Sequence, residues 1–151
     1  MPRLIMLIAT GFYTGYLPKA PGTWGTLLAF PVHLLISPLP SAIYTTTLFI
    51  IFCVAVFTAG AAEKILDSKD PGIIVIDEII GMLIALICVP ASPAAWLAVF
   101  ILFRFFDIVK PFPVNWLDKR LNGGLAIVMD DVAAGGYTLL CLHLYFYLKG
   151  S

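Results

Sequence analysis

Long apolar runs, separated by short polar stretches, are the feature that most constrains how this chain can fold. A membrane-spanning helix needs roughly 20 mainly apolar residues, with about 17 as the lower limit. The runs at 42–62 and 132–148 meet this requirement, whereas the run at 23–36 is shorter and contains Pro31, which would kink a helix. Only 12% of the residues are charged, against about 25% in a typical soluble domain. The sequence therefore predicts a single integral membrane domain over residues 1–151.

The apolar run at 79–103 is ambiguous because Pro90 and Pro93 lie in its middle. As one helix it would be about 37 Å long. Proline lacks an N–H donor and disfavours helix in the residue before it. We therefore favour a hairpin with arms at 76–89 and 94–106, each roughly 20 Å long. The predicted fold is an all-α, integral membrane helical bundle with about four or five membrane-embedded helices, two of them in this Pro-broken hairpin.

The charged residues fall almost entirely in three places: Lys19, 63–78 and 104–131. The links at 37–41 and 90–94 carry no charge. If the apolar runs form two hairpins, the three charged places meet on one membrane face, which the positive-inside rule makes cytoplasmic. The cations on this face are Lys19, Lys64, Lys69, Arg104, Lys110, Lys119 and Arg120. The formal net charge is zero, so nothing points to nucleic acid as a partner.

Five acidic residues lie at or near predicted helix ends on the charged face. They are Asp77, Glu78, Asp107, Asp130 and Asp131. Carboxylates gathered at a membrane interface repel one another unless a cation lies between them. Mg²⁺ binds oxygen ligands and often completes its shell with substrate phosphate. We therefore predict a Mg²⁺ site formed by Asp77, Glu78, Asp130 and Asp131, with Asp107 as a further ligand or as a neighbour of the ligands.

The same acids also have structural interpretations. Asp130 or Asp131 could cap a helix, because an acid at a helix N-terminus binds free N–H groups and suits the helix dipole. One cap would explain one acid and leave the other unexplained. Asp77 and Glu78 could be ordinary first-turn acids. Apolar residues surround them on both sides, however, and ionisable groups in such sequence indicate function.

Basic and polar residues near these acids are candidates for binding an anion. Arginine offers a planar fork of donors and lysine a point charge. Arg104 could alternatively pair with Asp107 three residues on, and the helix dipole alone would favour Lys110 at a helix C-terminus. Thr23, in "PKAPGTWGT", could be an N-cap beside free N–H groups that hold a phosphate oxygen, which Lys19 would also reach.

Four motifs together resemble the phosphatidylglycerophosphatase A family: "PKAPGTWGT", "VIDEIIGM", "FRFFDIVKPFP" and "GGLAIVMDDVAAG". They are spread over residues 12–136. The resemblance implies Mg²⁺-dependent hydrolysis of phosphatidylglycerophosphate to phosphatidylglycerol and phosphate, in a multi-pass protein of the bacterial inner membrane whose active site faces the cytoplasm. One departure is that Ala126 stands where the family usually has a second glycine, in what we expect to be a loop before Asp130.

The residues themselves suggest a division of roles. Glu78, Asp107 and Asp131 are the expected catalytic groups, with Glu78 orienting or deprotonating the attacking nucleophile. The residues expected to bind substrate and neutralise its charge are Lys19, Thr23, Arg104 and Lys110. The expected partner is a phospholipid in the bilayer. A covalent aspartyl-phosphate intermediate is an alternative to direct attack by water.

Two other classes of membrane protein could use the same acids. An ion-binding or transport protein also carries intramembrane carboxylates, but no inverted repeat is evident here. An alcohol-phosphatidyl transferase is also metal-dependent, but its D-x-x-D-G-x-x-A-R signature is missing from the sequence. His33 and His143 lie within apolar runs and are more typical of buried or interfacial histidines than of nucleophiles.

Overall fold

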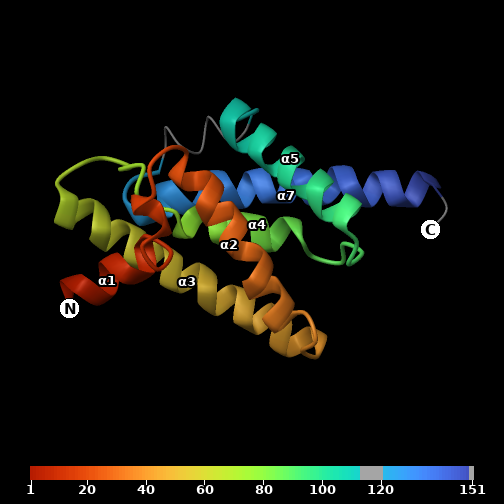
Figure 1. The fold of residues 1–151 in the computed structure, drawn as a ribbon, viewed down its shortest axis with the longest axis horizontal. Helices are drawn as coiled ribbons and strands as arrows, with labels where there is room; N and C mark the ends of the chain where they lie inside the picture. The colour runs from red at the N-terminus through yellow and green to blue at the C-terminus, as the bar shows by residue number, and fades with distance from the viewer. Residues whose placement is uncertain (113–120, 150–151) are drawn as a thin grey trace.

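A computed structural model describes residues 1–112 and 121–149 of the chain, and all regular elements in those ranges are helical (Figure 1). In chain order they are α1 (Pro2–Ala9), the 3-10 turn η1 (Thr14–Tyr16), α2 (Pro21–Ile36), α3 (Ser41–Leu66), α4 (Ile76–Ala85), α5 (Pro93–Val109) and α7 (Gly124–Lys149). The all-α prediction is therefore confirmed for the described ranges. Lys119 and Arg120, counted above on the cytoplasmic face, lie outside the described residues.

Two of these helices are long and apolar enough to cross a bilayer, α3 over its full 26 residues and α7 over Gly124–Leu148. Both contain the apolar runs from which spans were predicted. Only 22% of the apolar stretch of α3 is buried within the protein. The rest of this stretch therefore needs an apolar environment outside the protein. These two helices support the prediction that the chain is a membrane protein. The total number of membrane-embedded helices stays a prediction.

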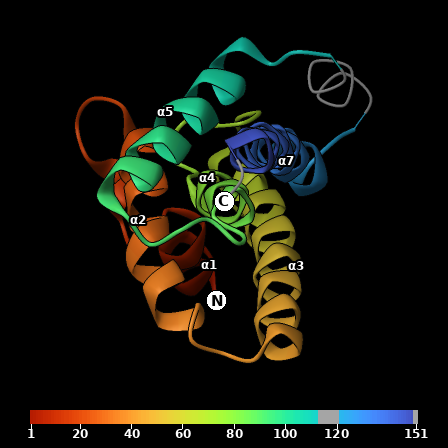
Figure 2. The same ribbon diagram turned by 90° about the vertical axis from the view of Figure 1, so that its right-hand side faces the viewer.

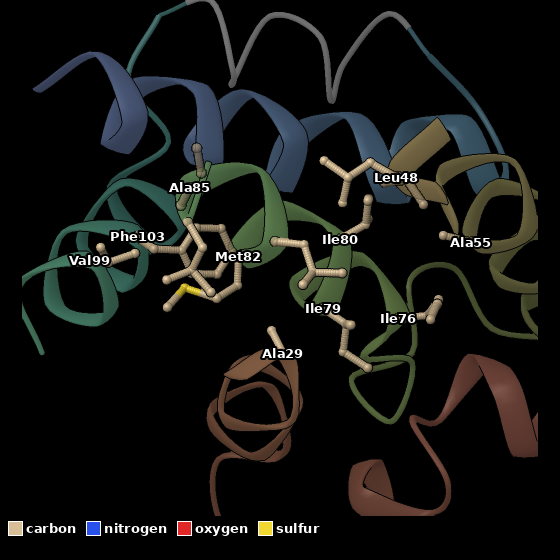
Figure 3. Close-up of a cluster of buried hydrophobic side chains, with 14 of the residues drawn as sticks. Ala29, Leu48, Ala55, Ile76, Ile79, Ile80, Met82, Ala85, Val99 and Phe103 are labelled. Carbon is tan, nitrogen blue, oxygen red and sulfur yellow. The ribbon is translucent and has the colours of Figure 1, made fainter. Parts of the chain in front are cut away.

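The short helix α4 lies at the centre of the fold, with α2, α3, α5 and α7 packed around it (Figure 2). Its ten residues would reach only about 15 Å. Ile80 and Met82 are fully buried, and Phe103 of α5 joins the same apolar cluster (Figure 3). A helix too short to span a bilayer is stable here because protein, not lipid, surrounds it.

The chain leaves the α-helical conformation after Ala85 and resumes it at Pro93. The Ser92 side chain caps α5 by accepting a hydrogen bond of 3.2 Å from the backbone N–H of Ala95. A continuous helix over 79–103 is therefore not formed. α4 ends before the expected boundary at 89, α5 extends past 106, and the chain turns back between them (Figure 1). Insertion of these two helices into a membrane as a hairpin stays a prediction.

α4 and α7 approach each other closely through glycines. A Cβ atom added to Gly135 would lie 2.2 Å from the carbonyl oxygen of Gly81, and one added to Gly81 would lie 2.6 Å from the carbonyl oxygen of Asp131. Side chains at these positions would force the two backbones apart. The contact therefore holds Asp131 directly beside α4.

Substituting Gly135→Ala is expected to lower the free energy of unfolding by about 1–3 kcal/mol, because the added methyl group meets backbone, which cannot move aside as a side chain would. Gly136→Ala is the matched control: an added Cβ there meets nothing within 4 Å, and alanine favours helix over glycine by roughly 1 kcal/mol. Thermal unfolding of both variants in the same detergent measures the difference. Equal melting temperatures would contradict the close contact.

Candidate active site

Three carboxylates converge where the start of α4 meets α7. Asp77 and Glu78 lie in the first turn of α4, as expected, and Asp131 comes from α7. Each offers one carboxylate oxygen, and these oxygens all lie within 4.8 Å of one another. Asp77 and Asp131 are only 7% and 3% exposed. Residues more than 50 positions apart in the sequence thus form one buried acidic cluster.

The cluster has unsatisfied hydrogen-bonding capacity. Asp77 Oδ1, Glu78 Oε2 and Asp131 Oδ1 are buried and accept no hydrogen bond from the described residues. Burying a carboxylate oxygen without a donor is costly, and burying three side by side adds mutual repulsion. Carboxylate oxygens are the ligands that hard divalent cations prefer. The donor set therefore fits a Mg²⁺-type ion.

The environment of α4 disfavours ionisation of its two acids, both of which lie outside the two candidate spanning helices. Burial raises the pKa of Asp77 well above its usual value, and the neighbouring charges of Glu78 and Asp131 raise it further. Burial also raises the pKa of Glu78 to about 7. A bound cation is the kind of neighbour that would keep such carboxylates ionised at neutral pH.

Arg104 of α5 lies beside the acidic cluster. Its Nη1 atom is 2.7 Å from Asp107 Oδ2 and 3.8 Å from Glu78 Oε1. The pairing of Arg104 with Asp107 that the spacing of three residues suggests is therefore formed. Because Arg104 also faces Glu78, Asp107 holds the guanidinium group between itself and the cluster.

Asp130 faces a different partner from its neighbour. The Lys110 ammonium group contacts Asp130 Oδ2, and Asp130 Oδ1 accepts a hydrogen bond of 3.0 Å from the backbone N–H of Asp131. Lys110 ends α5 in a left-handed conformation with φ of 45°. Asp130 is thus not one of the three converging acids, although it was predicted as a metal ligand. It holds the lysine that the sequence marked for anion binding.

The interpretation of Asp130 or Asp131 as a helix N-cap is wrong. α7 begins at Gly124, so the segment before Asp130, which includes the buried Ala126, is helical and not a loop. The early start follows from packing against α3, because a Cβ added to Gly124 would lie 1.9 Å from the carbonyl oxygen of Val56.

The N-terminus of α2 completes the site, through a residue that sequence reasoning missed. A Cβ atom added to Gly22 would lie 2.1 Å from Glu78 Oε1 and 3.1 Å from Arg104 Nη1. The first turn of α2 therefore directly abuts the acidic cluster and its arginine. The Pro-Gly pair that opens this turn was the available signal, since only glycine permits such a close approach of backbone to a side chain.

The interpretation of Thr23 as an N-cap is wrong by three positions. Ala20 is the N-cap and Pro21 the first helical residue, because the fixed φ of proline suits that position and its missing N–H costs nothing there. Thr23 is half-buried in the first turn, and its N–H group donates to the carbonyl oxygen of Ala20 over 2.9 Å. Lys19 lies on the exposed loop just before this turn.

Comparison with known proteins identifies the group to which this chain is similar. The family model described as Phosphatidylglycerophosphatase A matches residues 7–146. A Phosphatidylglycerophosphatase A from Escherichia coli is 38% identical over 130 residues, which cover 85% of this chain and 76% of the relative. One from Haemophilus influenzae is 37% identical over 148 residues, covering 95% and 89%.

A third relative, from Bacteroides thetaiotaomicron, is named provisionally as a phosphatidylinositol-3-phosphatase and is 37% identical over 154 aligned positions, covering 97% of this chain and 96% of its own length. No solved structure matches the chain. The family model matches most of this chain, and the two relatives of that name are aligned over 76% and 89% of their own length. The chain therefore belongs to the phosphatidylglycerophosphatase A family.

Proposed function

We propose that this protein hydrolyses the terminal phosphate of phosphatidylglycerophosphate, giving phosphatidylglycerol and inorganic phosphate, at the cytoplasmic side of a bacterial inner membrane. Family membership and the names of two relatives support the reaction. The observation that carries the proposal is the buried acidic cluster, which has unsatisfied oxygens and lies beside an arginine and a helix N-terminus. Such a site suits a metal ion and a phosphate together.

Asp77, Glu78 and Asp131 are the residues that would hold Mg²⁺, because their oxygens converge and are unsatisfied. When bound, the ion would polarise the phosphate and lower the pKa of a water molecule. Asp130 remains a predicted metal ligand, but Lys110 already contacts its carboxylate.

The remaining groups bind and orient the phosphate. Arg104 presents its guanidinium toward the cluster, and the N–H group of Gly22, in the first turn of α2, offers a donor at the positive end of a helix dipole. Lys110, held by Asp130, adds positive charge, and Lys19, on the exposed loop before α2, remains a predicted anion-binding residue. Together these groups stabilise the charge that spreads over the phosphoryl oxygens during transfer.

The reaction balances with water as the only co-substrate. The water oxygen forms a bond to phosphorus while the bond from phosphorus to the headgroup glycerol oxygen breaks. That glycerol oxygen ends with a proton, and inorganic phosphate leaves. We expect Glu78 to orient the attacking water as well as to help hold the ion, because it is the member of the acidic cluster that also faces Arg104.

Removing divalent metal is expected to stop phosphate release from phosphatidylglycerophosphate in mixed micelles, and adding back Mg²⁺ is expected to restore it. Release is measured with the purified protein before and after chelation. Phosphatidylinositol 3-phosphate serves as a second substrate, because one relative is named for it. Full activity in the presence of chelator would refute the metal site, and faster release from the inositol lipid would change the assigned substrate.

A further inference from the structure

A pocket lies away from the acidic cluster, at the turn between α2 and α3. Its volume is about 410 Å³, and residues of α2, α3 and the link after α4 line it. Among them are His33, Tyr44 and Cys88. In Figure 1 this turn lies at one end of α3, and the start of α7 lies near the other end.

Two buried polar atoms without partners among the described residues belong to side chains that line this pocket. His33 is 8% exposed, and its Nδ1 atom has no hydrogen-bond partner among the described residues. The hydroxyl group of Tyr44 is likewise buried and unsatisfied. The His33 ring meets the Tyr44 ring edge-on at a centroid distance of 6.2 Å. Orphaned buried groups are costly unless something binds them, so these atoms indicate a ligand with hydrogen-bonding oxygens.

The lining offers a charged ligand no counter-charge. The described residues that form the pocket include no aspartate, glutamate, lysine or arginine. Leu48 and Leu86 supply apolar walls beside the polar atoms. The pocket therefore suits an uncharged acceptor group that is joined to apolar chains.

The position of the pocket along α3 points to the source of such a group. α3 is 26 residues long, or about 39 Å, whereas the hydrocarbon core of a bilayer is about 30 Å thick. Ser41, Tyr44 and Thr45, which line the pocket, lie in the first two turns of α3. If α3 spans the bilayer, these turns lie at the depth of the lipid ester groups. The acidic cluster lies toward the other end, where Gly60 of α3 meets Gly124.

We propose that this pocket binds the glycerol-ester region of a phospholipid from the leaflet opposite the acidic cluster. An ester carbonyl oxygen accepts a hydrogen bond from the Tyr44 hydroxyl group, and the acyl chains lie along the apolar walls. Recognition depends on the ester groups and not on the headgroup. This site is separate from the phosphatase site, so the proposal stands whichever phosphomonoester the enzyme hydrolyses.

The native cysteine of the pocket provides the test. Cys88 is exposed and lines the pocket, whereas Cys141 is exposed in an apolar groove between α5 and α7. Proteins that retain only one of these cysteines are labelled with a thiol reagent in maltoside detergent, with added diester or diether phosphatidylcholine of equal chain length. The diester lipid is expected to slow labelling of Cys88 roughly two- to tenfold more than the diether lipid, as one hydrogen bond allows. Labelling of Cys141 is expected to respond equally to both lipids.

Tyr44→Phe keeps the ring and removes the donor, so it is expected to abolish the preference for the diester lipid at Cys88. Replacing phosphatidylcholine by phosphatidylglycerol is expected to leave the preference unchanged, because the pocket carries no charge. Equal protection by ester and ether lipids in the otherwise unchanged protein would overturn the proposal, and so would protection that follows headgroup charge. Absence of protection by any lipid would overturn it as well.

Discussion

Replacing Asp131 by asparagine is expected to lower phosphate release roughly 100- to 1000-fold, the range seen when a preorganised charge-stabilising group is lost from an active site. Asp131 is 3% exposed and supplies one of the three converging carboxylates, so its loss removes one ligand of the expected metal site. The same change is expected to raise the melting temperature of the metal-free protein by a few degrees, because it removes one of three mutually repelling acids. Lost activity together with gained stability separates a functional role from a structural one.

Asp130→Asn is the matched control, one residue away in the same helix. Asp130 binds Lys110 outside the converging acids, so we expect a loss of only about tenfold, of the size caused by removing a group that orients another. Binding of Mn²⁺, followed by its paramagnetic resonance, should weaken strongly in Asp131→Asn and little in Asp130→Asn. If the two variants lose activity and metal equally, the division of roles between these neighbours is wrong.

Gly22→Ala is expected to lower the rate of phosphate release about 100-fold, the effect of displacing reacting groups by about 1 Å. The added methyl group would lie 2.1 Å from Glu78 Oε1 and 3.1 Å from Arg104 Nη1, so both side chains must shift. Both are ends of flexible side chains, and alanine favours helix. Stability is therefore expected to hold while activity falls, as measured by unfolding and phosphate release on the same preparation.

Gly136→Ala is the control for this prediction too, because it adds the same methyl group to a helix where nothing lies within 4 Å. Its activity should match that of the unchanged protein, and its stability should match or slightly exceed that of the unchanged protein. A Gly22→Ala protein with full activity would mean that the first turn of α2 does not abut Glu78 and Arg104 during the reaction.

The long helices could be predicted from the sequence because their signal is local. Twenty apolar residues in a row demand a helix in an apolar surrounding, and the prolines at 90 and 93 locate the break after α4. The start of α7 could not be found in this way. "LNGG" has the composition of a loop, and Gly124 is helical because its backbone packs against Val56 and Gly60 of α3. That contact belongs to the tertiary fold.

The candidate site shows the same limit. Asp77, Glu78 and Asp131 could be chosen from sequence because acids in apolar surroundings need a reason to be there. The different orientation of Asp130 could not be predicted from the sequence, because it depends on residues 124–131 being helical. Gly22 was missed because a glycine carries no chemistry of its own. Its role appears only when α2, α4 and α5 are brought together.

The glycine contact between α4 and α7 also determines how the site responds to movement of the two helices. Their backbones approach each other tightly at Gly81 and Gly135, and Asp131 lies one helical turn before Gly135. When two rods tilt about their point of contact, displacement grows with distance from that fulcrum. If membranes of different thickness tilt the long α7, its far end swings while the spacing between Asp131 and the acids of α4 changes least.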